Sequence, residues 1–210
     1  MKQRFTKLAA PPTSGTKAVD RALAVLAAFG ERDSWTLTEL AQAVSLHKTT
    51  TYRLLGALAR ADFVTRDEVG FTYRLGPGLL ALAARALRAM DLYHAAHPEL
   101  CDLAGTSGET ATLEILVGHD VLILDEVKGR HLVGSAPEIG TRWPAHATST
   151  GKVLLAAAKD AGRLPRRRRL ERLTTRTITS ALRLARELEL VSRRGYAVAR
   201  GEVEPGFTAI

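Results

Sequence analysis

The sequence is poor in cysteine and in aromatic residues: among 210 residues it has one cysteine, Cys101, and only 5% Phe, Trp and Tyr. One cysteine excludes an internal disulfide framework and any metal site built from several thiolates. No apolar run approaches the roughly 18 residues that a membrane-spanning helix needs, and no apolar segment follows the basic start Met1–Arg4. The sequence therefore predicts no membrane span and no signal peptide. We expect a soluble cytoplasmic protein in which Cys101 is a small buried residue.

The composition is otherwise typical of a folded protein with a basic surface. Hydrophobic residues make up 46% and charged residues 25%, near the average for globular chains. Lys and Arg number 30 against 22 Asp and Glu, a net charge of +8, which favours a polyanionic partner. Residues 163–200 carry 12 basic and 3 acidic side chains, centred on Arg166–Arg169. This run is either a nucleic-acid contact or a solvated surface, and the sequence leaves both open.

Residues 17–76 predict three helices followed by a hairpin. Residues 1–16 are rich in Pro, Thr, Ser and Gly and predict a flexible tail. Apolar residues at three- and four-residue spacing predict a helix that Gly30 ends. Thr36 and Glu39 have the spacing of a capping box and start a second helix, which runs to about Val44. A third helix is expected over 47–61, and two β-prone runs, 63–66 and 71–74, flank a turn at 67–70.

The third helix presents a polar face that suits the major groove of DNA. At 100° per residue, Thr51, Leu54 and Leu58 share the inward side, whereas Thr49 and Arg53 point outward together. Both lie in the first two turns, where a recognition helix touches bases, and Arg can bind guanine through two hydrogen bonds. We expect the flanking residues Lys48, Thr50 and Tyr52 to hold phosphates. Arg66 and Arg74, in the hairpin, suit either a neighbouring phosphate or the minor groove.

A wide apolar stripe follows the hairpin. It lies on a predicted helix within residues 77–91 that links the DNA-binding region to the rest of the chain. We expect the stripe to form the seam of a homodimer, with packing inside one chain as the alternative. Its residues are Leu79, Leu82, Ala83, Ala86, Leu87 and Met90. Beyond it, residues 92–210 predict an α/β domain with helices over 92–105, 151–158 and 181–193 and strands over 110–117, 121–127 and 196–199.

Several separated segments resemble the IclR family of transcription regulators, in the family's order. Residues 17–23 are similar to the opening helix of the family, 46–55 to its recognition helix, and 73–76 to the strand that closes its wing. Residues 139–152 resemble the signature of its effector domain, and 193–198 match a late landmark. The resemblance covers about residues 17–210.

The resemblance implies an α+β protein with three parts. These are a winged helix-turn-helix over 17–76, a linker and dimerisation helix over 77–91, and a GAF-like effector-binding domain over 92–210. It implies a regulator of metabolic genes that binds a double-stranded operator as a homodimer or dimer of dimers, without a cofactor or metal. It also implies a small organic or aromatic acid as effector, held by Leu132, Ser135, Trp143, Ser149 and Thr150. The amides at the start of the helix near Gly151 suit a carboxylate.

This chain departs from the family pattern at four places. Ser45 stands where the family often has Gly, and Ala199 where some members carry an acidic pocket residue, with Glu202 and Glu204 nearby. Ser149 and Thr150 replace smaller residues, which narrows that wall and adds two hydroxyls. The chain ends at Ile210 inside a segment that resembles a strand, so we expect an incomplete effector domain. A DNA-binding module that has lost sensing is therefore one alternative.

An enzyme is the other alternative. It would use His146 with Ser149, or a metal held by His94 and His97, which have helical i, i+3 spacing. No orienting carboxylate or oxyanion hole can be identified from the sequence. We therefore expect a regulator without catalytic activity.

Overall fold

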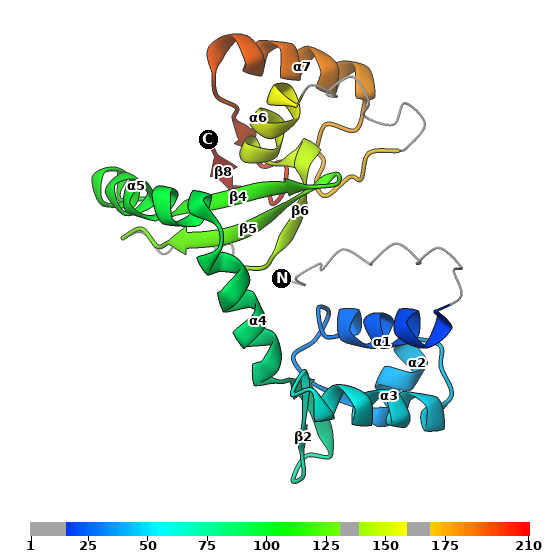
Figure 1. Ribbon diagram of the computed structural model, residues 1–210. Helices are drawn as coiled ribbons and strands as arrows, with labels where there is room; N and C mark the ends of the chain where they lie inside the picture. Colours follow the sequence, from blue (N-terminus) through cyan, green and yellow to red (C-terminus); the bar gives the residue numbers. More distant parts are fainter. Residues whose placement is uncertain (1–15, 131–138, 159–168) are drawn as a thin grey trace. The chain divides into compact units, whose positions relative to one another are not determined.

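The computed structural model describes residues 16–130, 139–158 and 169–210 (Figure 1). The chain forms two compact units, Met1–His94 and Ala95–Ile210. The tail predicted over 1–16 falls almost entirely outside the described residues, as do Leu132, Ser135 and the arginines 166–168. Within the described ranges, no helix has both the length and the apolar character to cross a bilayer.

The first unit has the helix-turn-helix and hairpin order that the sequence predicts. Its three strands form an antiparallel sheet in the order β1-β3-β2. The core contains Val25 from the first helix, Leu40 and Leu55 from the next two, and Val64 and Tyr73 from the hairpin. The elements are α1 (Lys17–Ala28), β1 (Trp35–Thr36), α2 (Leu37–Ala43), α3 (Lys48–Arg60), β2 (Val64–Asp67), β3 (Thr72–Leu75) and α4 (Pro77–Arg88).

The start of α2 confirms the capping box. The Thr36 amide donates to Glu39 Oε2 at 3.0 Å, and the Glu39 amide donates to Thr36 Oγ1 at 3.3 Å. The hydrogen bond from the Thr36 amide is the main reason why the pKa of Glu39 is lowered. The short strand β1 was not predicted; Trp35 and Thr36 pair with Tyr73 and Thr72 of β3. Thr36 therefore ends a strand and caps a helix at once, which fixes α2 against the hairpin.

The second unit contains a three-stranded antiparallel sheet in the order β4-β5-β6 and a separate pair, β7 with β8. Helix α5 (Asp91–Ser107) spans the boundary between the two units in the sequence. The strand predicted over 196–199 is wrong for its first three residues, because β7 begins only at Ala199. The remaining elements are β4 (Ala111–Val117), β5 (Asp120–Val127), β6 (Arg142–Pro144), η1 (Ala145–Ala147), α6 (Ser149–Ala157), α7 (Ala181–Arg194), β7 (Ala199–Arg200) and β8 (Thr208–Ala209).

Helices α6 and α7 lie together over the β4–β5–β6 sheet (Figure 1). Leu155 of α6 and Leu184 and Leu188 of α7 form one buried cluster with Val121 of β5. Helix α5 contributes Leu100 to a second cluster, with Ala104 and Ala111. The apolar packing of α6 on the sheet sets the position of its first turn, which contains two of the predicted effector residues.

Candidate DNA-binding and effector sites

Helix α3 presents the polar face that its periodicity predicts. Thr51, Leu55 and Leu58 are buried, whereas Lys48, Thr49 and Arg53 are exposed and Tyr52 is 54% exposed. Thr50 is partly buried. The inward residues hold α3 in the core, so the outward residues stand on a rigid support.

The first turn of α3 is fixed by His47 and Thr51. His47 is the N-cap, and its Nδ1 accepts a hydrogen bond from the Thr49 amide at 3.4 Å. Thr51 is fully buried, and its hydroxyl donates to the His47 carbonyl at 3.2 Å. The cap binds the amide of Thr49, one of the two residues predicted to reach bases, and so orders the end of the helix that carries them.

The hairpin places its two arginines on opposite faces. Arg66 pairs with Tyr73, and Arg74 pairs with Thr65. Residues directly opposite each other in a sheet share a face, and successive residues alternate. Arg66 and Arg74 are both exposed, but they project to different sides, so a single phosphate does not meet both. The Arg66 guanidinium lies over the ring of Phe71, 5.9 Å from its centroid.

No residue of α4 is buried. Leu82 is 53% exposed, Ala83 and Ala86 are exposed, and Leu79, Leu87 and Met90 (just beyond α4) are partly buried. The apolar stripe predicted from the sequence is therefore present on this helix, and none of its residues is buried among the described parts of the chain.

The first turn of α6 has a side-chain cap and a close backbone contact. Thr148 is the N-cap, and its hydroxyl accepts from the Gly151 amide at 3.0 Å. A Cβ on Gly151 would lie 2.2 Å from the Ala145 carbonyl oxygen, so only glycine fits at this position. Ser149 is buried and Thr150 partly buried. The cap satisfies the Gly151 amide, and Ser149 and Thr150 are the first two residues of the helix.

Trp143, the other predicted effector residue that the structure describes, lies in β6 opposite Val121. Its side chain is partly buried and packs against the cluster shared by α6, α7 and the sheet. It therefore borders the core of the second unit.

A buried ion pair beside this region was missed in the sequence. The Lys152 ammonium, which is fully buried, donates to Glu202 Oε1, and Glu202 is 8% exposed. His146 is buried nearby and bonds through Nε2 to the Glu171 carbonyl oxygen at 2.9 Å. Burial lowers the pKa of His146, Glu202 raises it and Lys152 lowers it further. In the sequence, the only indication of this ion pair is that Lys152 lies in an otherwise apolar stretch of the predicted helix.

Glu114 was also missed. It lies in β4 between Leu113 and Ile115, and its Oε1 accepts a hydrogen bond from Thr112 Oγ1 at 3.1 Å. Burial raises the pKa of Glu114, and the hydroxyls of Thr112 and Thr150 offset part of that rise. Thr150 is one of the predicted effector residues.

The predicted alternative sites are not assembled. His94 Nε2 bonds the Arg88 carbonyl at 3.2 Å, whereas His97 Nδ1 bonds Asp125 Oδ2 at 2.6 Å. Cys101, expected to be buried, is exposed, and its Sγ lies 3.7 Å from His97 Nε2. The described residues contain no group of three or more His, Cys, Asp or Glu side chains arranged to hold a metal ion.

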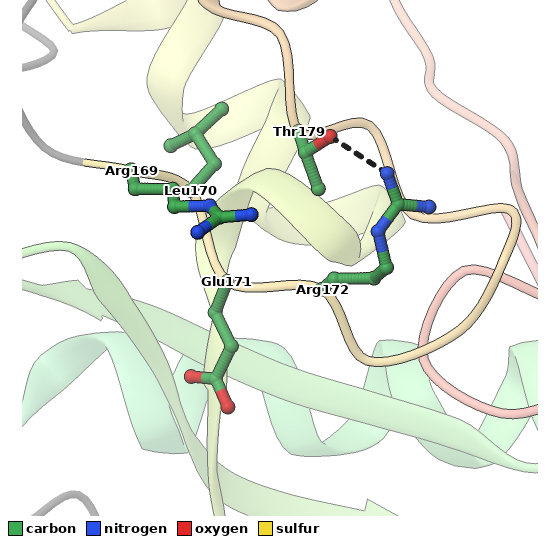
Figure 2. A pocket seen from close by; sticks show the side chains of 5 residues that line it. All are labelled: Arg169, Leu170, Glu171, Arg172 and Thr179. Atoms are coloured by element: carbon green, nitrogen blue, oxygen red, sulfur yellow. Dashed lines mark hydrogen bonds between the residues drawn. The ribbon is translucent and has the colours of Figure 1, made fainter.

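Figure 2 shows a pocket of about 290 Å³ in the second unit. It is lined by Arg169, Leu170, Glu171, Arg172 and Thr179, and Arg172 Nη2 donates to Thr179 Oγ1 at 3.3 Å. Arg169 is the one member of the predicted arginine run that the structure describes. None of the three predicted effector residues that the structure describes, Trp143, Ser149 and Thr150, lines this pocket.

Two family models match the chain in the order of its two units. The IclR helix-turn-helix domain matches residues 18–68, and the C-terminal domain of bacterial IclR transcriptional regulators matches residues 84–210. The chain belongs to the IclR family. Its α+β architecture, a helix-turn-helix domain followed by an α/β effector-binding domain, is that of the family's transcriptional regulators.

Curated relatives of this IclR-family chain are transcriptional regulators. It is 35% identical over 205 residues to the regulator BhcR of Paracoccus denitrificans, covering 97% of this chain and 74% of BhcR. It is 32% identical over 194 residues to the transcriptional repressor IclR of Escherichia coli, covering 90% of this chain and 70% of the repressor.

Solved structures similar to this chain are also IclR-type proteins. An IclR transcriptional regulator from Alicyclobacillus acidocaldarius has a TM-score of 0.81 and 32% identity, covering 93% of this chain and 80% of its own. An IclR homologue from Microbacterium hydrocarbonoxydans, complexed with 4-hydroxybenzoate, has a TM-score of 0.81 and 27% identity, covering 91% and 80%. The IclR-family chain is thus a DNA-binding transcriptional regulator with an effector-binding domain.

Proposed function

We propose that this IclR-family chain binds a double-stranded operator as a homodimer in the cytoplasm and that a small organic or aromatic acid controls the binding. In this proposal the chain is not an enzyme. His146 has a structural role, because its Nε2 is hydrogen-bonded to the Glu171 carbonyl oxygen. The observation that carries the proposal is the exposed polar face of α3, whose opposite side is anchored in the core.

The two sides of α3 divide the contacts with DNA. Thr49 and Arg53 reach base edges in the major groove, where an Arg reads guanine. Lys48, Thr50 and Tyr52 bind phosphates and set the register without reading sequence. Arg66 and Arg74, on opposite faces of the hairpin, meet different parts of the duplex.

The uncovered stripe on α4 forms the seam between two chains. Its exposed residues include Leu82, Ala83 and Ala86, and burial of such a stripe against a second copy removes apolar surface from water. Operators read by dimers contain two half-sites, so the spacing of two α3 helices sets the affinity. The effector acts by favouring one arrangement of the dimer.

The effector binds at the start of α6. The Ser149 and Thr150 amides lie at the positive end of this helix, which attracts an anionic group. Trp143 supplies an apolar wall, and Leu132 and Ser135, which lie outside the described residues, complete the predicted set. The relative bound to 4-hydroxybenzoate makes hydroxylated and plain benzoates the first ligands to test.

DNA binding to the gene's own upstream region tests the proposal. Fluorescence anisotropy is measured at several salt concentrations, with a scrambled duplex as control. We expect tight binding to the upstream duplex alone, with an affinity that falls steeply as salt rises, since the slope reports released counterions. Equal, weak binding to both duplexes would contradict the operator-binding function.

A further inference from the structure

Glu114 has a buried carboxylate oxygen that nothing in the chain's described ranges satisfies. Thr112 Oγ1 donates to Glu114 Oε1 at 3.1 Å, and Thr150 lies close enough to Glu114 for its hydroxyl to lower the pKa of the carboxyl group. The second oxygen, Oε2, is buried and has no hydrogen-bond partner. The carboxyl group is therefore half satisfied.

Such an arrangement is costly unless something fills it. An unpaired polar atom removed from water loses its hydration without replacement. Burial raises the pKa of Glu114 above its ordinary value, and the hydroxyls of Thr112 and Thr150 offset part of that rise. The Thr112 hydroxyl holds Oε1 in place, while Oε2 keeps its capacity to accept a hydrogen bond.

Glu114 lies beside the first turn of α6, because Thr150, whose hydroxyl lowers its pKa, is the second residue of that helix. Ser149 and Thr150 are the proposed effector residues there. The negative charge of Glu114 already faces the positive end of α6. A carboxylate of the effector is repelled by Glu114, so the part of the effector that lies nearest to Oε2 is a donor.

We propose that Glu114 determines the specificity of the effector site by accepting a hydrogen bond from a hydroxyl of the ligand. The effector is then a hydroxy acid: its hydroxyl donates to Glu114 Oε2, and its carboxylate lies farther along the site, at the amides of Ser149 and Thr150. This inference rests on the proposed function, because it assumes that the effector binds at the start of α6.

Matched ligands test the hydrogen bond directly in the unaltered protein. Each set contains a plain acid, its hydroxy derivative and its methoxy derivative, which accepts a hydrogen bond but does not donate one. The sets are benzoate with its 2-, 3- and 4-substituted derivatives, and acetate with glycolate and methoxyacetate. Dissociation constants come from calorimetry on the full chain. We expect one hydroxy acid to bind at least 10-fold more tightly than both of its matched partners.

Glu114→Met tests the residue, because methionine keeps the side-chain length and removes both oxygens. We expect this variant to bind the hydroxy, methoxy and plain acids of the preferred set within about 2-fold of one another. Glu99→Gln, an exposed carboxylate on α5, is the matched control and keeps the preference. If Glu114→Met does not fold, the comparison of hydroxy with methoxy acids in the unaltered chain still decides.

The outcomes separate the two proposals. If acids bind but the hydroxy and methoxy derivatives bind equally, or if Glu114→Met keeps the preference, a water satisfies Oε2 and the specificity role is overturned, while the acid effector stands. If no acid in any set binds, the proposed effector class is overturned and the role of Glu114 falls with it.

Discussion

Ser45 adopts a backbone conformation that costs free energy for any residue with a Cβ. Its φ is 54°, in the left-handed region, and it lies in the turn between α2 and α3. This conformation is unfavourable for non-glycine residues by about 1–2 kcal/mol. Glycine would relieve this strain, but part of the stabilisation is lost because glycine has more conformational entropy in the unfolded chain. We expect Ser45→Gly to raise the free energy of unfolding by about 0.5–1 kcal/mol, measured by urea denaturation. Ser45→Ala keeps the strain and is expected to bring no gain; equal stabilisation by both would contradict the explanation.

Arg53 is the residue of α3 best placed to read sequence. It is exposed in the second turn, on the same face as Thr49. We expect Arg53→Ala to weaken binding to the operator by about 1–3 kcal/mol, the value of one good base contact, with little change on a scrambled duplex. Arg85→Ala, on α4, is the control of equal charge. A uniform loss on both duplexes would assign Arg53 to phosphates.

His146 makes the stability of the second unit depend on pH. Its pKa is lowered by burial, so the unfolded chain takes up a proton near pH 6.5 while the folded chain resists. The stabilisation is complete above pH 6.5 and is lost as pH falls toward the lowered pKa. We expect a falling melting temperature below pH 6.5 and a shallower fall in His146→Gln. His119→Gln, at an exposed histidine, should behave as the unaltered chain does.

At the scale of elements, α4 carries the dimer hypothesis. We expect Leu82→Lys with Leu87→Lys to convert the dimer into monomers, because two charges in an apolar seam cannot be buried unpaired. Light scattering measures the mass. Ala81→Lys with Ala84→Lys adds the same charge on the opposite side of the helix and should leave the dimer intact. An unchanged mass for the leucine variant would place the seam elsewhere.

The helices of the first unit could be predicted because their signals are local. Thr36 and Glu39 mark a helix start within four residues, and the apolar periodicity of α3 identifies its buried side. The strand β1 could not be predicted, since Trp35 and Thr36 become a strand only by pairing with Tyr73 and Thr72. The strand expected from 196 failed for the same reason: its partner β8 pairs only with Ala199 and Arg200.

The candidate sites also differ in whether they could be predicted from the local sequence. The exposed face of α3 follows from one helix and is readable from its sequence. The environment of Glu114 depends on Thr150, and that of Lys152 on a glutamate 50 residues later. No local pattern encodes such pairs; only a charged residue within an apolar run indicates that a partner exists.

At the scale of the molecule, the two units have separate cores, so damage to one is expected to spare the other. Lys152→Met leaves the buried Glu202 carboxylate unpaired, and we expect the second unit to lose about 3–5 kcal/mol of stability. Calorimetry should show its transition at lower temperature while that of the first unit is unchanged. Lys152→Met with Glu202→Leu removes both charges and should restore most of the loss; a double variant as unstable as the single one would contradict this account.

The Lys152–Glu202 pair also affects the order in which the two units fold during translation. The core of the first unit is complete once Tyr73 has been made, whereas the second unit cannot close its buried pair until Glu202 emerges. At 5–20 residues per second, roughly 10 s of synthesis separate these two moments. During this interval of synthesis, the DNA-binding face of α3 is already formed, whereas the effector-binding unit is not yet folded.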